Sequence, residues 1–151
     1  MRRTLIRLLR TDHGRRLLVG YRRATVILLE EEARDSRRYR GKPDPTLYLQ
    51  KEERELAVRI VAAKHETIAA VARDDFDAAL HALARLGPAV DAFFDKVNID
   101  VPAADRRENR LKLLNEIREA ARAVSDFARA GVQPPPEEMT IVTETVWARS
   151  L

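Results

Sequence analysis

Residues 86–127 read LGPAVDAFFDKVNIDVPAADRRENRLKLLNEIREAARAVSDF, and this stretch decides the fold because it predicts a helical hairpin. Pro88 suits the first turn of a helix, since its fixed φ fits there and its missing N–H needs no partner. Apolar residues then recur at helical spacing until residue 97, and Pro102 prevents the helix from continuing. A second, long helix is predicted over residues 104–129, with an apolar stripe made of Leu113, Leu114, Ile117, Ala120, Ala121, Val124 and Phe127.

Three further helices are predicted before this hairpin, over residues 15–34, 51–73 and 75–86. Asp12, Asp44 and Asp74 stand where a side chain can cap a helix start. The buried stripe expected for the first helix is Leu17, Leu18, Tyr21, Ala24, Thr25, Leu28 and Leu29. The sequence thus predicts an all-α helical bundle of about five or six helices, occupying residues 1–130.

Residues 131–151 predict an extended, Pro-rich C-terminal arm. Pro134–Pro136 cannot be helical, and residues 139–147 alternate Thr with Val, Ile and Trp, which is β-like. A single strand needs a sheet edge to pair with. Three alternatives stay open for this arm: no fixed structure, packing as an extended segment, or pairing with another chain.

The composition excludes several kinds of site. The chain has no Cys, so it has no disulfide, thiol nucleophile or thiolate ligand, and its three His residues are scattered. No catalytic constellation, metal site or cofactor-binding loop is recognisable. No apolar stretch approaches the roughly 20 residues that span a bilayer. We expect a cytoplasmic protein without a membrane partner, the alternative being that the basic, apolar residues 1–10 lie on a membrane surface.

Positive charge is concentrated at the start of the chain. Residues 1–42 hold 13 Lys/Arg and 5 Asp/Glu, a net charge of +8, whereas residues 43–151 hold 15 and 19, a net charge of −4. Such a basic region attracts a nucleic-acid backbone, although a solvated helix would also have this pattern. Cations surround Tyr39 in residues 34–42, which favours either RNA binding or a mobile surface loop.

The sequences of several segments resemble those of one family. The run Pro88 to Val97 and the later run Arg107 to Leu114 resemble two phrases of the C-terminal, DALR-type anticodon-binding region of the bacterial glycyl-tRNA synthetase β subunit. Two more segments, GYRRA at residues 20–24 and DDFDAALHALARL at residues 74–86, are similar to phrases of the same family. The resemblance covers about residues 12–127. Val26 departs from it, because the family usually has Asn there.

The resemblance implies a tRNA-binding module that contributes tRNA recognition to glycyl-tRNA aminoacylation. In that synthetase the chemistry is carried by the α subunit, so this chain is not expected to catalyse aminoacylation alone, and its status as an enzyme is left open. The resemblance implies a glycine-specific tRNA as the partner. The other expected partner is either a synthetase α subunit or, from the β-like pattern of the C-terminal arm, a second copy of the chain. The alternative is a protein-interaction or oligomerisation module without RNA binding. DNA binding ranks last, because no helix-turn-helix phrase is present.

The residues expected to contact RNA combine the family phrases with the exposed cations. They are Arg22, Arg23, Arg37, Arg38, Tyr39, Arg107 and Arg110. Asn109 is expected either to contact RNA or to clamp the long helix to the hairpin loop through backbone hydrogen bonds.

Overall fold

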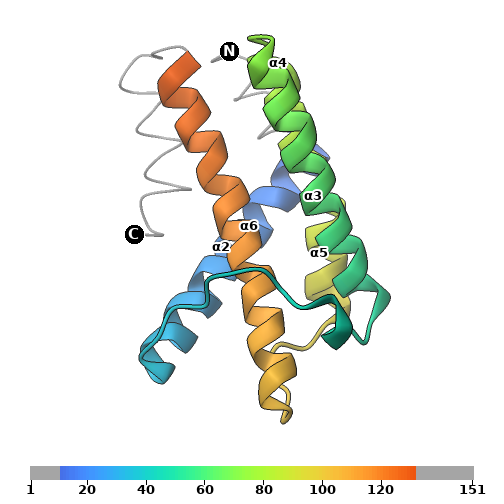
Figure 1. Cartoon of the computed structure of the whole chain (residues 1–151), viewed down its shortest axis with the longest axis vertical. Coiled ribbons are helices and arrows are strands. Elements are labelled where there is room, and N and C mark those ends of the chain that lie inside the picture. The colour runs from blue at the N-terminus through green and yellow to red at the C-terminus, as the bar shows by residue number, and fades with distance from the viewer. Residues whose placement is uncertain (1–10, 132–151) are drawn as a thin grey trace.

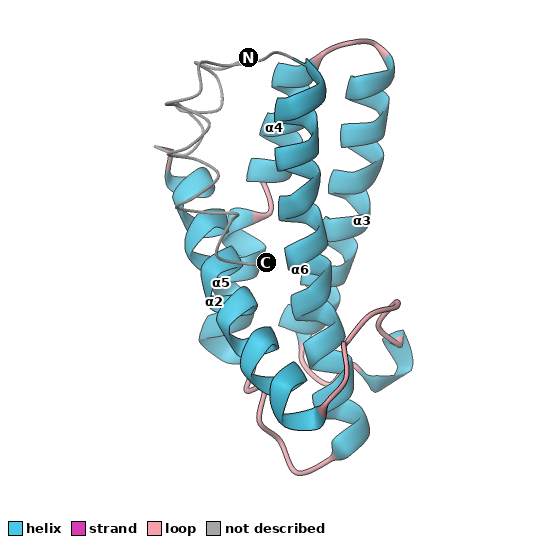
Figure 2. Ribbon diagram, turned by 90° about the vertical axis from the view of Figure 1, so that its left-hand side faces the viewer, coloured by secondary structure: helices cyan, strands magenta, loops and turns pink. Residues whose placement is uncertain are grey.

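The computed structural model describes residues 11–131, which form an elongated bundle of α-helices (Figure 1). Its elements are α2 (Asp12–Asp35), the short 3-10 helix η1 (Pro45–Leu47), α3 (Lys51–Ala72), α4 (Phe76–Ala84), α5 (Gly87–Lys96) and α6 (Ala104–Gly131). Figure 2 shows helices and loops but no strand over this range. The predicted all-α class is confirmed, while the predicted C-terminal arm lies outside the described residues.

The long helix α6 packs against α2, α3 and α4. In turn, α5 fills the space between α2 and α3. Burial of apolar side chains on these facing stripes is the main stabilising term. The largest buried apolar side chains are Leu28, Leu56, Leu83, Leu86, Val90, Phe93, Leu111, Leu113, Leu114 and Ile117. Among the described residues, no helix is long and apolar enough to cross a membrane.

Two of the three predicted helix caps are wrong by one residue. The side chain of Thr11, not Asp12, accepts a hydrogen bond from the N–H of Gly14 at 3.1 Å and starts α2. Asp75, not Asp74, caps α4. Asp74 has a φ of +57° and forms the turn instead, a conformation that Asp tolerates better than most residues. A neighbouring residue with a suitable oxygen therefore takes the capping position in both cases.

Leu29, which was expected in the core, lies partly outside it, and Phe94 on α5 is only partly buried. The Leu29 side chain ends the predicted α2 stripe but is 42% exposed, because each helical residue turns by about 100° and Leu28 already faces inward. Phe93 is fully buried, whereas Phe94 is partly buried and packs edge-on against it, with ring centroids 5.7 Å apart. The side chains of Ala121, Val124 and Phe127 lie outside the described part of α6.

Candidate nucleic-acid interface

The linker between α2 and α3 crosses the face of α6 as a fixed loop (Figure 1). Within it, Asp44 caps η1 as predicted, accepting a hydrogen bond from the N–H of Thr46 at 2.9 Å. Asn109 of α6 clamps the same residue: its Oδ1 accepts from the Asp44 N–H at 2.6 Å, and its Nδ2 donates to the Asp44 carbonyl at 3.0 Å. Asn109 thus has a structural role, although it holds the linker and not the hairpin loop.

Arg110 is an internal anchor. Its Nε donates to Oε1 of Glu53 at 2.9 Å, one Nη donates to the carbonyl of Asn98 at 2.5 Å, and the other lies 3.4 Å from Oε1 of Gln50. Only 3% of Arg110 is exposed, so its charge does not face solvent. The structure places this predicted RNA contact in the interior, where it joins α3, α6 and the α5–α6 loop.

Tyr39 is also buried, with 3% exposure. Its N–H donates to Glu32 at 3.0 Å, its hydroxyl donates to the carboxylate of Asp35, and the Arg37 guanidinium lies 4.6 Å from the ring centroid. The expected stacking surface for a base is therefore covered, which corrects the view of an open aromatic ring in a mobile loop. A base would have to displace Arg37 to reach it.

Arg107 completes this cluster from α6. Its guanidinium donates to the carboxylates of Glu31 and, at 2.9 Å, Asp35, and its side chain is 20% exposed. Hydrogen bonds from the hydroxyl of Tyr39 and from Arg107 hold the pKa of Asp35 below its ordinary value. Burial and the hydrogen bond to Asp35 raise the pKa of Tyr39. The cluster is thus a compensated ion-pair network that fixes the start of the linker.

The remaining predicted cations lie on the surface, in two separate places. Arg22 and Arg23 are exposed on α2, and the Arg23 guanidinium lies 4.8 Å from the ring centroid of Phe94 on α5. Arg37 and Arg38 are exposed after the end of α2. Residues 23 and 35 are about 18 Å apart along a helix that rises 1.5 Å per residue. The predicted residues therefore do not converge on one site.

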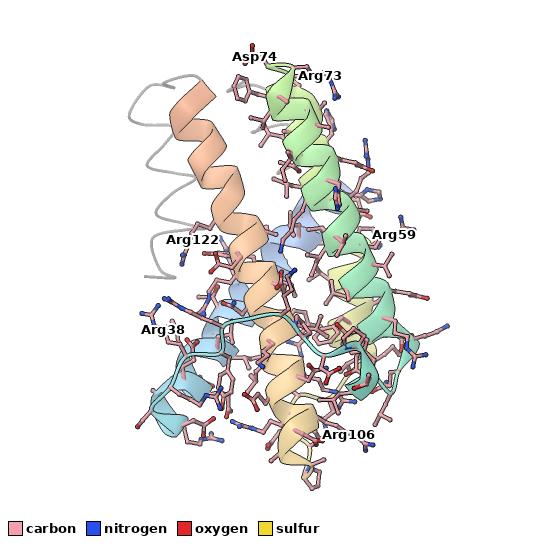
Figure 3. All side chains as sticks on the ribbon, in the orientation of Figure 1. Arg38, Arg59, Arg73, Asp74, Arg106 and Arg122 are labelled. Atoms are coloured by element: carbon pink, nitrogen blue, oxygen red, sulfur yellow. The ribbon has the colours of Figure 1, made fainter. Side chains whose placement is uncertain are left out.

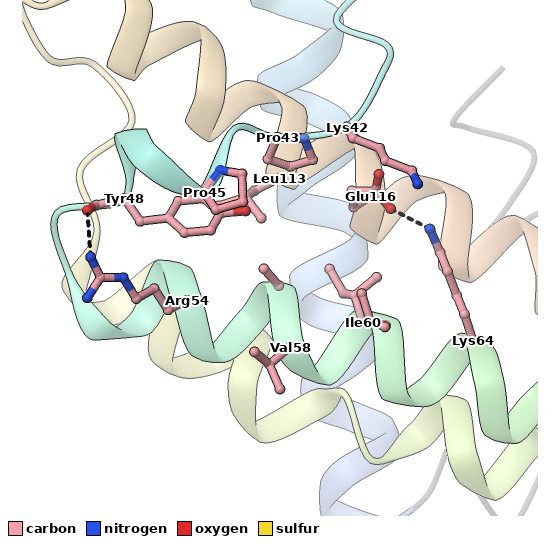
Figure 4. A pocket seen from close by; sticks show the side chains of 12 residues that line it. Lys42, Pro43, Pro45, Tyr48, Arg54, Val58, Ile60, Lys64, Leu113 and Glu116 are labelled. Carbon is pink, nitrogen blue, oxygen red and sulfur yellow. Dashed lines mark hydrogen bonds and ion pairs between the residues drawn. The ribbon is translucent and has the colours of Figure 1, made fainter.

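A groove that the sequence did not reveal lies between the linker, α3 and α6. Its volume is about 580 Å³, and its lining includes Lys42, Pro43, Pro45, Tyr48, Arg54, Val58, Val61, Lys64 and Leu113. Figure 4 shows the groove from close by. A second hollow of about 480 Å³ shares Lys42, Lys64 and Glu116 with it and extends to Arg40 and Arg122. One signal was available in the sequence: Val58 and Val61 are apolar but lie off the buried stripe of α3. Among residues 11–131, no cluster of His, Asp and Glu side chains could hold a metal ion.

Two known proteins with sequences similar to this chain share one name, glycine–tRNA ligase beta subunit. Over 120 residues the chain is 42% identical to the glycine–tRNA ligase beta subunit of Rhodospirillum centenum, a match that covers 79% of this chain and 17% of that protein. The corresponding subunit of Phenylobacterium zucineum is 42% identical over 123 residues, covering 80% of this chain and 18% of the relative. The match spans less than a fifth of the length of these curated relatives. No solved structure matches.

The family model for the DALR anticodon binding domain matches residues 17–127. This range runs from the first turns of α2 through most of α6 and includes all the anchors that hold the linker. The resemblance noted in the sequence is thereby confirmed. Since the match covers well over half of the chain, the protein belongs to the DALR anticodon binding domain family.

Proposed function

We propose that this chain is a tRNA-binding module that contributes recognition of a glycine-specific tRNA to glycyl-tRNA aminoacylation. The observation that carries the proposal is the match to an anticodon binding family over residues 17–127. The relatives support the identity of the tRNA, because they are glycine–tRNA ligase beta subunits. The net charge of +8 over residues 1–42 supports attraction to a phosphate backbone. A cytoplasmic location is part of the same proposal.

Within this function, the exposed arginines contact phosphates and the buried residues act indirectly. Arg22, Arg23, Arg37 and Arg38 present their side chains to solvent. Phosphate contacts of this kind position an RNA without reading its sequence. The second group fixes the linker against α6 and consists of Tyr39, Arg107, Asn109 and Arg110.

The direct test is binding of the whole chain to tRNA(Gly) and to a mismatched tRNA at two salt concentrations. Tighter binding to tRNA(Gly) that persists at the higher salt concentration supports anticodon reading. Equal binding that disappears with salt reduces the role to a basic surface, because phosphate contacts alone depend steeply on salt. The absence of binding to either tRNA rejects the proposal.

A charge-matched pair of variants tests the phosphate contacts. Arg22→Glu with Arg23→Glu should weaken binding and reduce the salt slope by roughly 1 for each lost phosphate contact. The control is Arg59→Glu with Arg73→Glu, which changes the net charge equally. In Figure 3, Arg59 of α3 and Arg73, the residue directly after α3, lie on the side of the molecule opposite to Arg38 and Arg122. Equal loss in both double variants would show a net-charge effect without a defined surface.

The second proposed function is protein interaction, either with a synthetase α subunit or between two copies of the chain. The β-like pattern of residues 140–147 favours it, because an extended segment can add to an exposed strand edge. Deleting residues 131–151 and measuring the mass in solution tests self-association. A smaller mass supports pairing through this arm, and an unchanged mass removes its support.

A further inference from the structure

We propose that the groove between the linker and α3 receives one unstacked base of single-stranded RNA, while the cations around it hold the flanking phosphates. The inference rests on the proposed tRNA-binding function and gives that function a site. The shape, the charge and the fixed position of the groove support it.

The groove has an apolar lining that is partly open to solvent. Tyr48, Ile60 and Leu113 form its buried part, whereas Val58 and Val61 are 66% and 54% exposed. In Figure 4 the ring of Tyr48 lies along the groove. Its volume of about 580 Å³ is within the range of pockets that hold small ligands. A flat heterocycle such as a nucleobase fits an apolar slot that contains an aromatic ring.

The rim carries an excess of positive charge. Five cations line the groove and the adjoining hollow, against two acids, Glu116 and Glu119. Lys64 pairs with Glu116 at 2.6 Å and Arg122 with Glu119 at 3.6 Å. Three cations remain unbalanced: Arg40, Lys42 and Arg54.

This arrangement selects a particular ligand chemistry. Base and phosphate are adjacent in a single strand, so an apolar slot beside unbalanced cations complements one nucleotide and its neighbours. Paired RNA keeps its bases stacked inside the helix and would leave the slot unused. The ligand that fits both features is therefore an unpaired segment, such as the loop of a stem–loop.

The groove is held in place before any ligand binds. Asn109 fixes the backbone of Asp44 on one side of η1, and Glu53 accepts hydrogen bonds from the N–H groups of Leu49 and Gln50 on the other. Pro43 and Pro45, which flank Asp44, further restrict the backbone there. Because the linker is already ordered, binding does not have to pay for ordering it.

The first experiment compares groove variants with control variants at exposed positions outside the groove, using the anticodon stem–loop of tRNA(Gly) as the probe. Val58→Asp and Lys42→Glu should each weaken binding by about tenfold, the effect expected for losing one stacked base or a close phosphate contact. Ile68→Asp and Arg73→Glu are the matched controls: Ile68 is 68% exposed on α3 but does not line the groove. The controls should remain within about twofold of the parent chain.

The second experiment separates the base from the phosphates. Val61→Ser should weaken binding of the intact stem–loop but not of the same RNA with abasic loop nucleotides, because only the intact loop has a base to lose. All these positions are exposed, so circular dichroism should show an unchanged fold.

Three results overturn the inference. If the parent chain binds tRNA(Gly) selectively and the groove variants behave like their controls, the groove does not bind the base, while the proposed function is retained. If Val58→Asp dissociates a dimer and leaves RNA binding unchanged, the groove belongs to a second copy of the chain. If the parent chain binds no tRNA, the proposed function and the groove fail together.

Discussion

Arg110 of α6 and Glu53 of α3 form an ion pair inside the protein, with Nε and Oε1 2.9 Å apart and with side-chain exposures of 4% and 1%. Their remaining polar atoms are also used. Arg110 donates to the Asn98 carbonyl, and the second Glu53 oxygen accepts from the N–H groups of Leu49 and Gln50. Full hydrogen bonding offsets the cost of removing the two charges from water. The pair thus joins α6 to the linker and to the first turn of α3.

Removing one partner of this pair should destabilise the fold strongly, because the other charge stays buried without compensation. Glu53→Ala is expected to lower the free energy of unfolding by about 3–5 kcal/mol, measured by urea denaturation. Arg85→Ala is the control, since Arg85 pairs with Glu66 on the surface, with exposures of 62% and 51%, and should change stability by at most about 1 kcal/mol. Similar effects of the two substitutions would contradict the interior position of the Glu53 pair.

Stability should fall in acid because several carboxylates are held ionised in the folded state, among them the buried Glu53 and the partly buried Glu32. Burial alone would raise the pKa of Glu53, but hydrogen bonds from Arg110 and from two backbone N–H groups outweigh it and lower that pKa. For Glu32, burial is likewise outweighed by Arg118 and by the N–H of Tyr39, which lower its pKa. The folded state therefore binds these protons less readily than the unfolded chain.

The carboxylates of Glu53 and Glu32 contribute their full stabilisation above the unfolded-state pKa of about 4.3, and the contribution is lost as the pH falls through the folded-state values. Urea midpoints measured between pH 7 and pH 3 should decrease in acid, and Glu53→Gln should make the decrease shallower. Glu66→Gln, at an exposed position, should leave the slope unchanged. An unaltered slope in Glu53→Gln would show that Glu53 does not carry the effect.

Periodicity predicted most of the fold, because burial of one helix face imposes a 3.6-residue repeat that the sequence displays directly. The boundaries of α3 and α6 and the buried core around Phe93 and Leu113 follow from that repeat. Leu29 was assigned wrongly, since a residue at the edge of a stripe is buried only if the neighbouring helix covers it. The sequence of one helix does not show which of its edge residues a neighbouring helix will cover.

The site was less predictable, because its contacts join residues that are distant in the sequence. Tyr39 and its surrounding cations resemble an open RNA-binding loop, but Arg107, 68 residues away, helps to close the cluster. Arg110 finds Glu53 at a separation of 57 residues. The groove likewise exists only because the linker is folded against α3 and α6. Residue types therefore indicated a basic protein, whereas tertiary packing decided which cations face solvent.

Releasing the linker from α6 should cost less than breaking the buried ion pair. Asn109→Ala removes the two hydrogen bonds to Asp44, each worth about 0.5–1.5 kcal/mol, and should therefore lower the free energy of unfolding by about 1–3 kcal/mol. Hydrogen exchange of the Asp44 amide should become faster. Asn98→Ala is the control, because its side chain is exposed and its carbonyl contact with Arg110 is retained. Unchanged exchange at Asp44 in Asn109→Ala would disprove the clamp.

The close contact between α2 and α5 depends on the missing side chain of Gly20. A Cβ at this position would lie 2.0 Å from Cγ1 of Val90, far inside van der Waals distance. Alanine favours a helix over glycine by about 1 kcal/mol, but crowding in a packed core costs about 1–3 kcal/mol, so Gly20→Ala should destabilise the chain. Thermal unfolding monitored by circular dichroism would measure the difference.

A second substitution shows whether crowding is the cause. Val90→Ala removes the clashing methyl groups, so adding it to Gly20→Ala should cost less than adding it to the parent chain. The coupling energy from the double-mutant cycle is expected to be about 0.5–3 kcal/mol in favour of the double variant. If Gly20→Ala instead stabilised the chain by its helix propensity, with no coupling to Val90, α2 and α5 would have to lie farther apart than in this structure.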